Sequence, residues 1–227
     1  MDAAPGGGPS RCAIALALAV AVAAALGLVA CAQPAYDRAN ACRYALEYWD
    51  KVASDGFYFA DREAPTRFGP GVAVPADGTG FDCAHFVSCC IGSESNDPGG
   101  GLLVPSRTAA YGEPGAQRLV DWLIAQGATR ATDVSSLAPG DVVAYDRNSD
   151  GWIDHVALYI GDGQVAAHSI TRVGAWDHDA KGAVMPVRLP GTDASPSGAG
   201  PTAWIAWAVG AVVLLGLAAC VVASGAR

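Results

Sequence analysis

Residues 80–91 read Gly-Phe-Asp-Cys-Ala-His-Phe-Val-Ser-Cys-Cys-Ile, and this stretch decides the fold. Asp82 is typical of a helix N-cap, so we expect Cys83 in the first turn of a helix. Phe86 and Val87 follow at helical spacing and can bury one face of that helix. The unpaired N–H groups at a helix N-terminus favour a thiolate, which makes Cys83 a candidate nucleophile. The competing interpretation is a small buried core residue, the usual fate of a free cysteine.

The composition indicates one exported domain between two apolar ends. The chain has 227 residues, 52% of them hydrophobic, and a formal net charge of −8. Residues 33–190 are enough for a single domain with one core. Residues 191–201 are rich in Ser, Pro and Gly and predict a flexible linker. The acidic balance and the lack of any Arg/Lys-rich run argue against nucleic-acid binding.

The first apolar segment ends in two overlapping processing signals. Residues 1–32 are typical of a signal sequence, and Ala30-Cys31-Ala32 fits ordinary signal cleavage. Leu28-Val29-Ala30-Cys31 resembles a bacterial lipoprotein box, which would place a lipid on Cys31. The segment is also longer than a usual signal core of about 7–15 residues, so an uncleaved anchor is the third reading. Each of the three exports the domain.

The second apolar segment predicts a C-terminal transmembrane helix over residues 202–223. About 20 apolar residues cross a bilayer, and no charge occurs here before Arg227. Trp204 and Trp207 lie at its start, where interfacial aromatic residues are common. A buried soluble helix is the alternative, but the stretch is apolar on every face. We therefore expect a cell-membrane protein with a single C-terminal span and its domain on the extracytoplasmic side.

The periodicity changes from helical to strand-like along the domain. A helix is expected over 36–53, a long Gly/Pro-rich loop over 54–80, and a second amphipathic helix over 114–126. Strands are expected over 141–145, 155–160, 164–168 and 184–189, the last weakened by Pro186. Gly161-Asp162-Gly163 between two apolar runs indicates a hairpin. Helices followed by an antiparallel sheet define the fold class as α+β.

Two histidines could complete a thiol active site. His155 opens a strand and His168 lies across the hairpin, where neighbouring strands are about 4.8 Å apart. A cysteine hydrolase needs a nucleophile, a base and a group that orients the base. We expect Cys83, His155 and His168 in these three roles. The backbone N–H of Cys83 and the hydroxyl of Tyr58 are candidate oxyanion donors. Structural or surface histidines are the alternative.

Residues 146–154 match the first nine positions of a calcium loop, D-x-N-x-D-G-x-I-D. Asp146, Asn148 and Asp150 could therefore hold a structural calcium ion. The bidentate glutamate expected at position twelve is replaced by Ala157, which favours a plain polar turn.

The remaining cysteines predict little covalent cross-linking. If Cys83 stays free, at most one intramolecular disulfide forms, Cys42 with Cys89 or Cys90. The chain has no Cys-x-x-Cys pair and no His-rich zinc pattern.

Three motifs resemble the NlpC-type papain-like cysteine peptidases: Asp82-Cys83-x-x-Phe86-Val87-Ser88, Leu137-x-Pro139-Gly140-Asp141-Val142, and Asp154-His155-Val156-Ala157. The helix from Tyr36 and the run from Cys83 are closer still to the related putative amidase domain. The resemblance covers about residues 36–171. It implies a papain-like (NlpC-type) fold, a dyad at Cys83 and His155 with His168 third, and cleavage of amide bonds in bacterial cell-wall peptides. Cys89 stands where the amidase group often has glutamine.

We therefore expect an exported, membrane-tethered cysteine hydrolase that cleaves amide bonds of peptides or peptidoglycan stem peptides and requires no cofactor. Its expected partners are that substrate and the membrane. Two alternatives stay open. One is a catalytically inactive binding domain of the same fold, displayed at the membrane. The other is an acyl or glutamyl transferase, in which an amine replaces water.

Overall fold

The computed structural model describes residues 35–62, 64–75 and 80–190. These residues belong to the first of two compact units, residues 1–191. The expected signal segment (residues 1–32), linker and C-terminal span lie outside them. Within the described ranges, no helix is long and apolar enough to cross a membrane.

Three helices carry the N-terminal half of the domain. They are α2 (Arg38–Tyr48), α3 (Cys83–Ile91) and α4 (Ala116–Ala125). Helix α2 is shorter than the predicted 36–53, since it begins after the N-cap Asp37 and ends at Tyr48, with Trp49 as its C-cap. Every residue of α3 is buried, so the helix lies inside the core and buries all of its faces rather than only the expected one. Helix α4 buries Leu119, Val120 and Leu123 on one face, as expected of an amphipathic helix.

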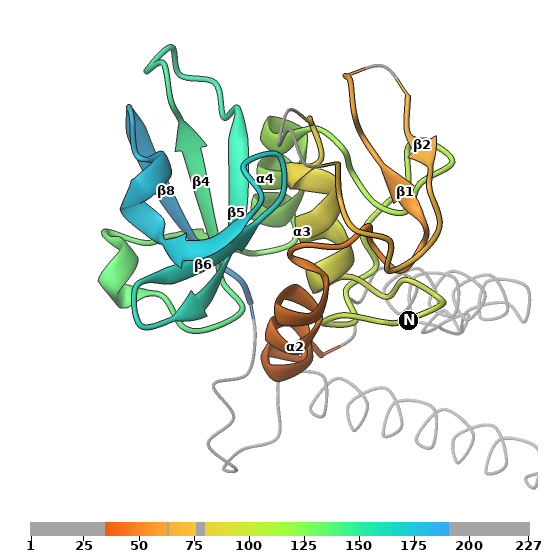
Figure 1. Ribbon diagram of the computed structural model, residues 1–227. Coiled ribbons are helices and arrows are strands. Elements are labelled where there is room, and N and C mark those ends of the chain that lie inside the picture. Colours follow the sequence, from red (N-terminus) through yellow and green to blue (C-terminus); the bar gives the residue numbers. More distant parts are fainter. Residues whose placement is uncertain (1–34, 63, 76–79, 191–227) are drawn as a thin grey trace, which may run out of the picture. The chain divides into compact units, whose positions relative to one another are not determined.

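An antiparallel sheet forms the C-terminal half, which confirms the α+β class. Its six strands have the order β3-β8-β4-β5-β6-β7. Their bounds are β3 Thr129–Arg130, β4 Val142–Asp146, β5 His155–Gly161, β6 Gln164–Ala167, β7 Arg172–Ala175 and β8 Ala183–Arg188. Two short 3₁₀ helices, η1 (Val134–Ser136) and η2 (Trp176–Asp179), lie between strands. A separate pair, β1 (Phe57–Tyr58) and β2 (Thr66–Arg67), lies on the other side of α3 from this sheet (Figure 1).

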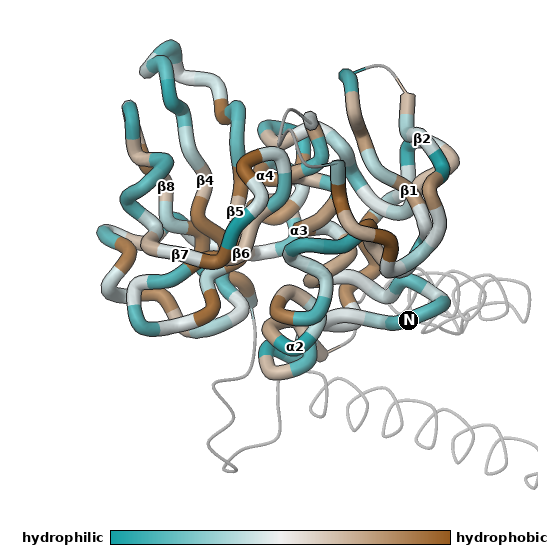
Figure 2. Tube along the Cα trace, in the orientation of Figure 1, coloured by the Kyte–Doolittle hydropathy of each residue, from teal (hydrophilic) through white to brown (hydrophobic). Residues whose placement is uncertain are grey.

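The two faces of the sheet bury different clusters, because successive side chains of a strand point to opposite sides. Val156 and Leu158 of β5 pack with α3 in the larger cluster. Ala157 and Tyr159 pack on the opposite face with Tyr145. Hydrophobic residues accordingly gather along β4 and β5 (Figure 2). Burial on both faces explains why these strands read as continuous apolar runs rather than as alternating ones.

Pro186 lies within β8 at little cost. It is in register with Val143 of β4, and its carbonyl accepts from Ala131 on the opposite side. The N–H and C=O of one strand residue point to the same side, so the missing N–H of Pro186 faces the short strand β3 rather than β4. The long ladder to β4 therefore stays complete.

Helix α2 is fastened to the start of the sheet by an ion pair between partly buried Arg38 and buried Asp141. Arg38 donates to Asp141 at 2.7 Å, and the same carboxylate oxygen accepts from the Leu189 amide. The hydroxyl of Tyr36 donates to the carbonyl of Gly140 at 2.6 Å. These contacts fix the Gly140-Asp141 corner, from which β4 runs toward His155 on β5.

Candidate active site

Asp82 occupies the N-cap position of α3, but its side chain does not cap the helix. One carboxylate oxygen accepts from the Phe59 amide and lies 2.9 Å from Nδ1 of His85. The other lies 2.6 Å from Nδ1 of His168. Asp82 therefore joins the loop before α3, the helix itself and the end of β6. These contacts hold the backbone immediately before Cys83.

Cys83 begins α3 beside the peptide bond that follows His155. The Val156 backbone amide donates to the Cys83 thiol, which places the sulfur next to β5. Burial raises the pKa of Cys83 to about 11, against the lowering effect of that amide bond. In the free protein, burial therefore outweighs the effect of the helix N-terminus, and Cys83 favours the thiol rather than the expected thiolate.

His155 is the first residue of β5, and only 1% of its surface is exposed. Burial lowers the pKa of His155 to about 4, while the Asp179 carboxylate acts in the opposite direction. A lone thiolate and a lone imidazolium are thus both disfavoured. If the proton of Cys83 moved to His155, the two opposite charges would form together and each would stabilise the other.

Asp179 is the acidic residue that sequence reasoning missed. It ends η2, is buried, and one of its carboxylate oxygens lies 3.6 Å from Nε2 of His155. The same oxygen accepts from Arg172 at 2.6 Å. Neither Nε2 of His155 nor Oδ1 of Asp179 forms a hydrogen bond to the described residues. No motif marks Asp179, because the turn that brings it back to β5 depends on tertiary structure.

His168 lies away from His155, which differs from the expected arrangement. Its Nδ1 faces Asp82, and its Nε2 lies 2.8 Å from the carbonyl oxygen of Tyr48. The ring stacks on Phe86 with centroids 4.0 Å apart. Leu158 pairs with Ala166, so the same register continued would place position 169 opposite His155. A shift of one residue moves a side chain to the other face of the sheet.

Cys83 and His155 line the same pocket, of about 380 Å³. Its wall includes three arginines and two exposed aromatic residues: Arg62, Arg118, Arg147, Phe81 and Trp152. A larger hollow, of about 540 Å³, is lined by Val134, Tyr159 and Trp176. It contains neither a cysteine nor a histidine, so the smaller pocket is the candidate active site.

Of the two expected oxyanion donors, the Cys83 amide lies at the cleft and the Tyr58 hydroxyl does not. The Cys83 amide donates to the Ser169 hydroxyl oxygen at 3.1 Å, and the Asp82 amide donates to the same oxygen at 2.8 Å. Ser169 also lines the pocket. The Cys83 donor is thus at the cleft but is occupied by a side chain. Tyr58 is buried and stands outside the set of described residues that form the pocket wall.

The calcium-like loop forms hydrogen bonds within itself. The Asp146 carboxylate accepts from the amides of Asp150 and Gly151, and Asp150 accepts from the amide of Trp152 and the side chain of Asn148. At the ninth position, Asp154 pairs with Arg147. These contacts make a stable polar turn without an ion, and calcium at Asp146, Asn148 and Asp150 stays a prediction.

The four cysteines in the described ranges, Cys42, Cys83, Cys89 and Cys90, are free thiols. The Cys42 disulfide considered above is therefore not formed in this structure.

The fold and the pocket define an α+β domain in which a cysteine at a helix N-terminus and a histidine on a strand share one cleft. The model of the putative amidase domain family matches residues 35–180, more than half of the chain, and the chain belongs to this family. Membership supports a hydrolase-like enzyme that acts on amide bonds. No curated protein and no solved structure matches the chain.

Proposed function

We propose that the protein is a cysteine amidase in which Cys83 is the nucleophile, His155 the general base and acid, and Asp179 the residue that orients His155. The observation that carries the proposal is that Cys83 and His155 line the same cleft. The Val156 amide, which follows His155, also donates a hydrogen bond to the Cys83 thiol. Asp179 takes the third role instead of His168, because its carboxylate is the one near the imidazole. The arrangement is that expected of papain-like (NlpC-type) peptidases, and we propose that the domain is related to that superfamily.

The chemistry follows from these positions. Nε2 of His155 faces Asp179, which leaves Nδ1 to take the thiol proton. The sulfur of Cys83 bonds to the substrate carbonyl carbon, and the carbonyl electron pair moves to oxygen. Collapse breaks the C–N bond as His155 returns the proton to the leaving amine. Water, deprotonated by His155, then hydrolyses the thioester and restores the thiol.

The oxyanion that forms during the reaction needs a hydrogen-bond donor, and in the free protein the Cys83 amide is already bonded to a side chain. The Cys83 amide bonds to Ser169 Oγ in the free protein. In the proposed mechanism the substrate oxygen displaces the Ser169 hydroxyl from this amide. The exchange replaces one hydrogen bond by a stronger one to a developing negative charge.

The wall of the cleft favours a substrate that carries carboxylates. Arg62, Arg118 and Arg147 line the cleft together with Asp61 and Asp154, so the wall carries a small excess of positive charge in a chain whose net charge is negative. Arg118 and Arg147 are held in place by Glu113 and Asp154. The exposed ring of Trp152 offers a surface for stacking or apolar contact. We infer an acidic peptide substrate, for which peptidoglycan stem peptides are the first candidates.

The sequence supports a location for this activity. We infer that the signal segment exports the domain and that residues 202–223 anchor it in the cell membrane, with the cleft on the extracytoplasmic side. Both segments lie outside the described residues.

The test uses the full chain with acidic peptides, including cell-wall stem peptides, and mass spectrometry of the products. We expect cleavage at one amide bond, loss of turnover in Cys83→Ala, and retained turnover in Cys90→Ala. Added amines separate hydrolysis from transfer, since a transferase yields a new amide. Peptide binding without any turnover, equal in Cys83→Ala, would instead identify the binding domain. The burial of Cys83 is the observation that favours this second candidate.

A further inference from the structure

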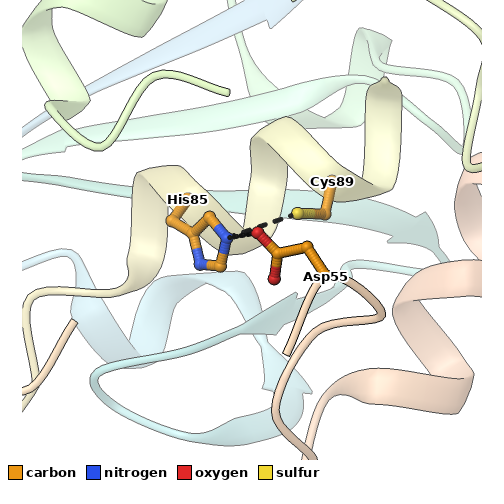
Figure 3. Close-up of side chains that lie close together, drawn as sticks. All are labelled: Asp55, His85 and Cys89. Carbon is orange, nitrogen blue, oxygen red and sulfur yellow. Dashed lines mark hydrogen bonds and ion pairs between the residues drawn. The ribbon is translucent and has the colours of Figure 1, made fainter. Parts of the chain in front are cut away.

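A second group of reactive side chains lies one turn farther along the nucleophile helix. His85 and Cys89 are four residues apart on α3, so they share a face of the helix. Asp55 reaches them from the loop before β1. The three side chains point toward one another (Figure 3), and their candidate ligand atoms all lie within 4.8 Å. The proposed catalytic mechanism uses none of them.

The separations match those of a tetrahedral metal site. Nε2 of His85 lies 3.1 Å from Oδ2 of Asp55 and 3.6 Å from Sγ of Cys89. A zinc ion about 2.0–2.1 Å from N and O and about 2.3 Å from S spaces those ligands about 3.4 and 3.6 Å apart. The two separations from His85 therefore match a tetrahedral site to within a few tenths of an ångström, and the separation between Asp55 and Cys89 is within 4.8 Å.

The outer contacts of His85 are those of a metal ligand. Nδ1 of His85 faces Asp82, and a carboxylate on the second nitrogen fixes the ring and makes Nε2 a better ligand. The other oxygen of Asp55 accepts from the Phe57 amide, and Oδ2 also accepts from the Tyr111 amide. Two of the three donors are therefore already oriented by neighbouring groups.

We propose that Asp55, His85 and Cys89 form a site for a divalent transition metal of the zinc class. A thiolate, an imidazole and a carboxylate are ligands that zinc accepts together. Binding releases the thiol proton of Cys89 and the proton between His85 and Asp55 to solvent. Three protein ligands leave one tetrahedral position for water, nearest to Asp55, whose side chain is 8% exposed whereas those of His85 and Cys89 are buried.

Such an ion would join the loop around Asp55 to α3. That loop is followed by β1 and by Phe59, whose amide bonds to Asp82 next to Cys83. The metal would then hold α3 against the segment that leads to Phe59 in the cleft wall, without touching the substrate.

The test measures cobalt and zinc binding by the full chain. All variants carry Cys83→Ala, which removes the other thiol–imidazole pair that could bind metal. After incubation with Co²⁺ and removal of excess ion, we expect about one ion per chain and a near-ultraviolet sulfur-to-cobalt absorption band. Cys89→Ala should lose the band, and His85→Asn and Asp55→Asn should lower cobalt retention. The matched control is Cys90→Ala, since Cys90 is equally buried on the same helix and should keep both signals.

Equal retention in Cys89→Ala and the parent, or no retained ion in the parent, would overturn the proposal. A second measurement needs no core substitution. Zn²⁺ should slow iodoacetamide labelling of Cys89 more than that of Cys90, as read by site-resolved mass spectrometry. Equal protection of both cysteines would also contradict a site at Asp55, His85 and Cys89.

Discussion

At the scale of single residues, the protonation of His155 depends on the Asp179 carboxylate next to its ring. Nε2 of His155 has the Asp179 carboxylate at 3.6 Å, and that carboxylate is itself held by Arg172. A carboxylate at this distance stabilises the imidazolium that forms when Cys83 loses its proton. The negative charge of Asp179 should therefore control how readily the proton moves.

Replacement of this carboxylate tests its role as a positioning residue. In Asp179→Asn the imidazolium loses its partner, so we expect turnover at neutral pH to fall by about 10- to 100-fold. The pKa of His155 should fall further, which moves the acid limb of the pH–rate profile to lower pH. Asp177→Asn, in the same short helix, is the control and should change neither value. An unshifted acid limb would show that Asp179 acts only on folding.

At the scale of elements, two aspartates at helix N-termini have different functions. The side chain of Asp37 caps α2 by accepting from the Asn40 amide. Asp82 precedes α3 in the same way, yet its side chain joins Phe59, His85 and His168 instead. The sequence located the start of α3 from Asp82, whereas the helix predicted from residue 36 begins two residues later, at Arg38. Sequence patterns could not show that Asp82 is a buried junction, because its partners come from distant segments.

The difference predicts unequal costs of removal. Asp37→Ala loses one exposed cap and should lower the free energy of unfolding by about 1 kcal/mol. Asp82→Ala leaves two buried histidines and an amide without their acceptor, and should cost about 3–5 kcal/mol. Denaturant unfolding of both variants measures the two values. Similar losses would mean that Asp82 is no more than a cap.

In the sheet, sequence periodicity predicted strands but not the register in which they pair. Strands β4, β5, β6 and β8, the Gly161–Gly163 hairpin and the α+β class were predictable, because apolar runs bounded by turn residues are local signals, whereas β1, β2, β3 and β7 were not predicted. The expected pairing of His155 with His168 depended on the register, which the sequence does not state. The register brings Asp179 and Ser169 to the site instead, through η2 and the turn after β6.

At the scale of the whole molecule, the burial of His155 links the site to stability. Its folded pKa of about 4 lies below the ordinary value of 6.5. The unfolded chain therefore binds the extra proton first as pH falls. The stabilisation is fully present above pH 6.5 and is lost as pH falls toward 4.

We expect the free energy of unfolding to fall by about 3 kcal/mol between pH 6.5 and pH 4 because of this one residue. His155→Gln cannot be protonated there, so its stability should depend less on pH across the same range. Denaturant titrations at several pH values compare the two chains. Parallel curves would show that His155 is not buried in its neutral form.

The central claim is that Cys83 and His155 exchange a proton, and iodoacetamide labelling of Cys83 against pH tests it most directly. In the full chain we predict a labelling rate that levels off between about pH 5 and pH 9, because the thiol proton passes to His155 without leaving the pair. In His155→Ala the rate should instead climb about tenfold per pH unit over this range, as for a lone thiol. Buried Cys90, followed in the same samples, should not respond to the substitution. Parallel, steadily rising curves for Cys83 in both chains would contradict the account.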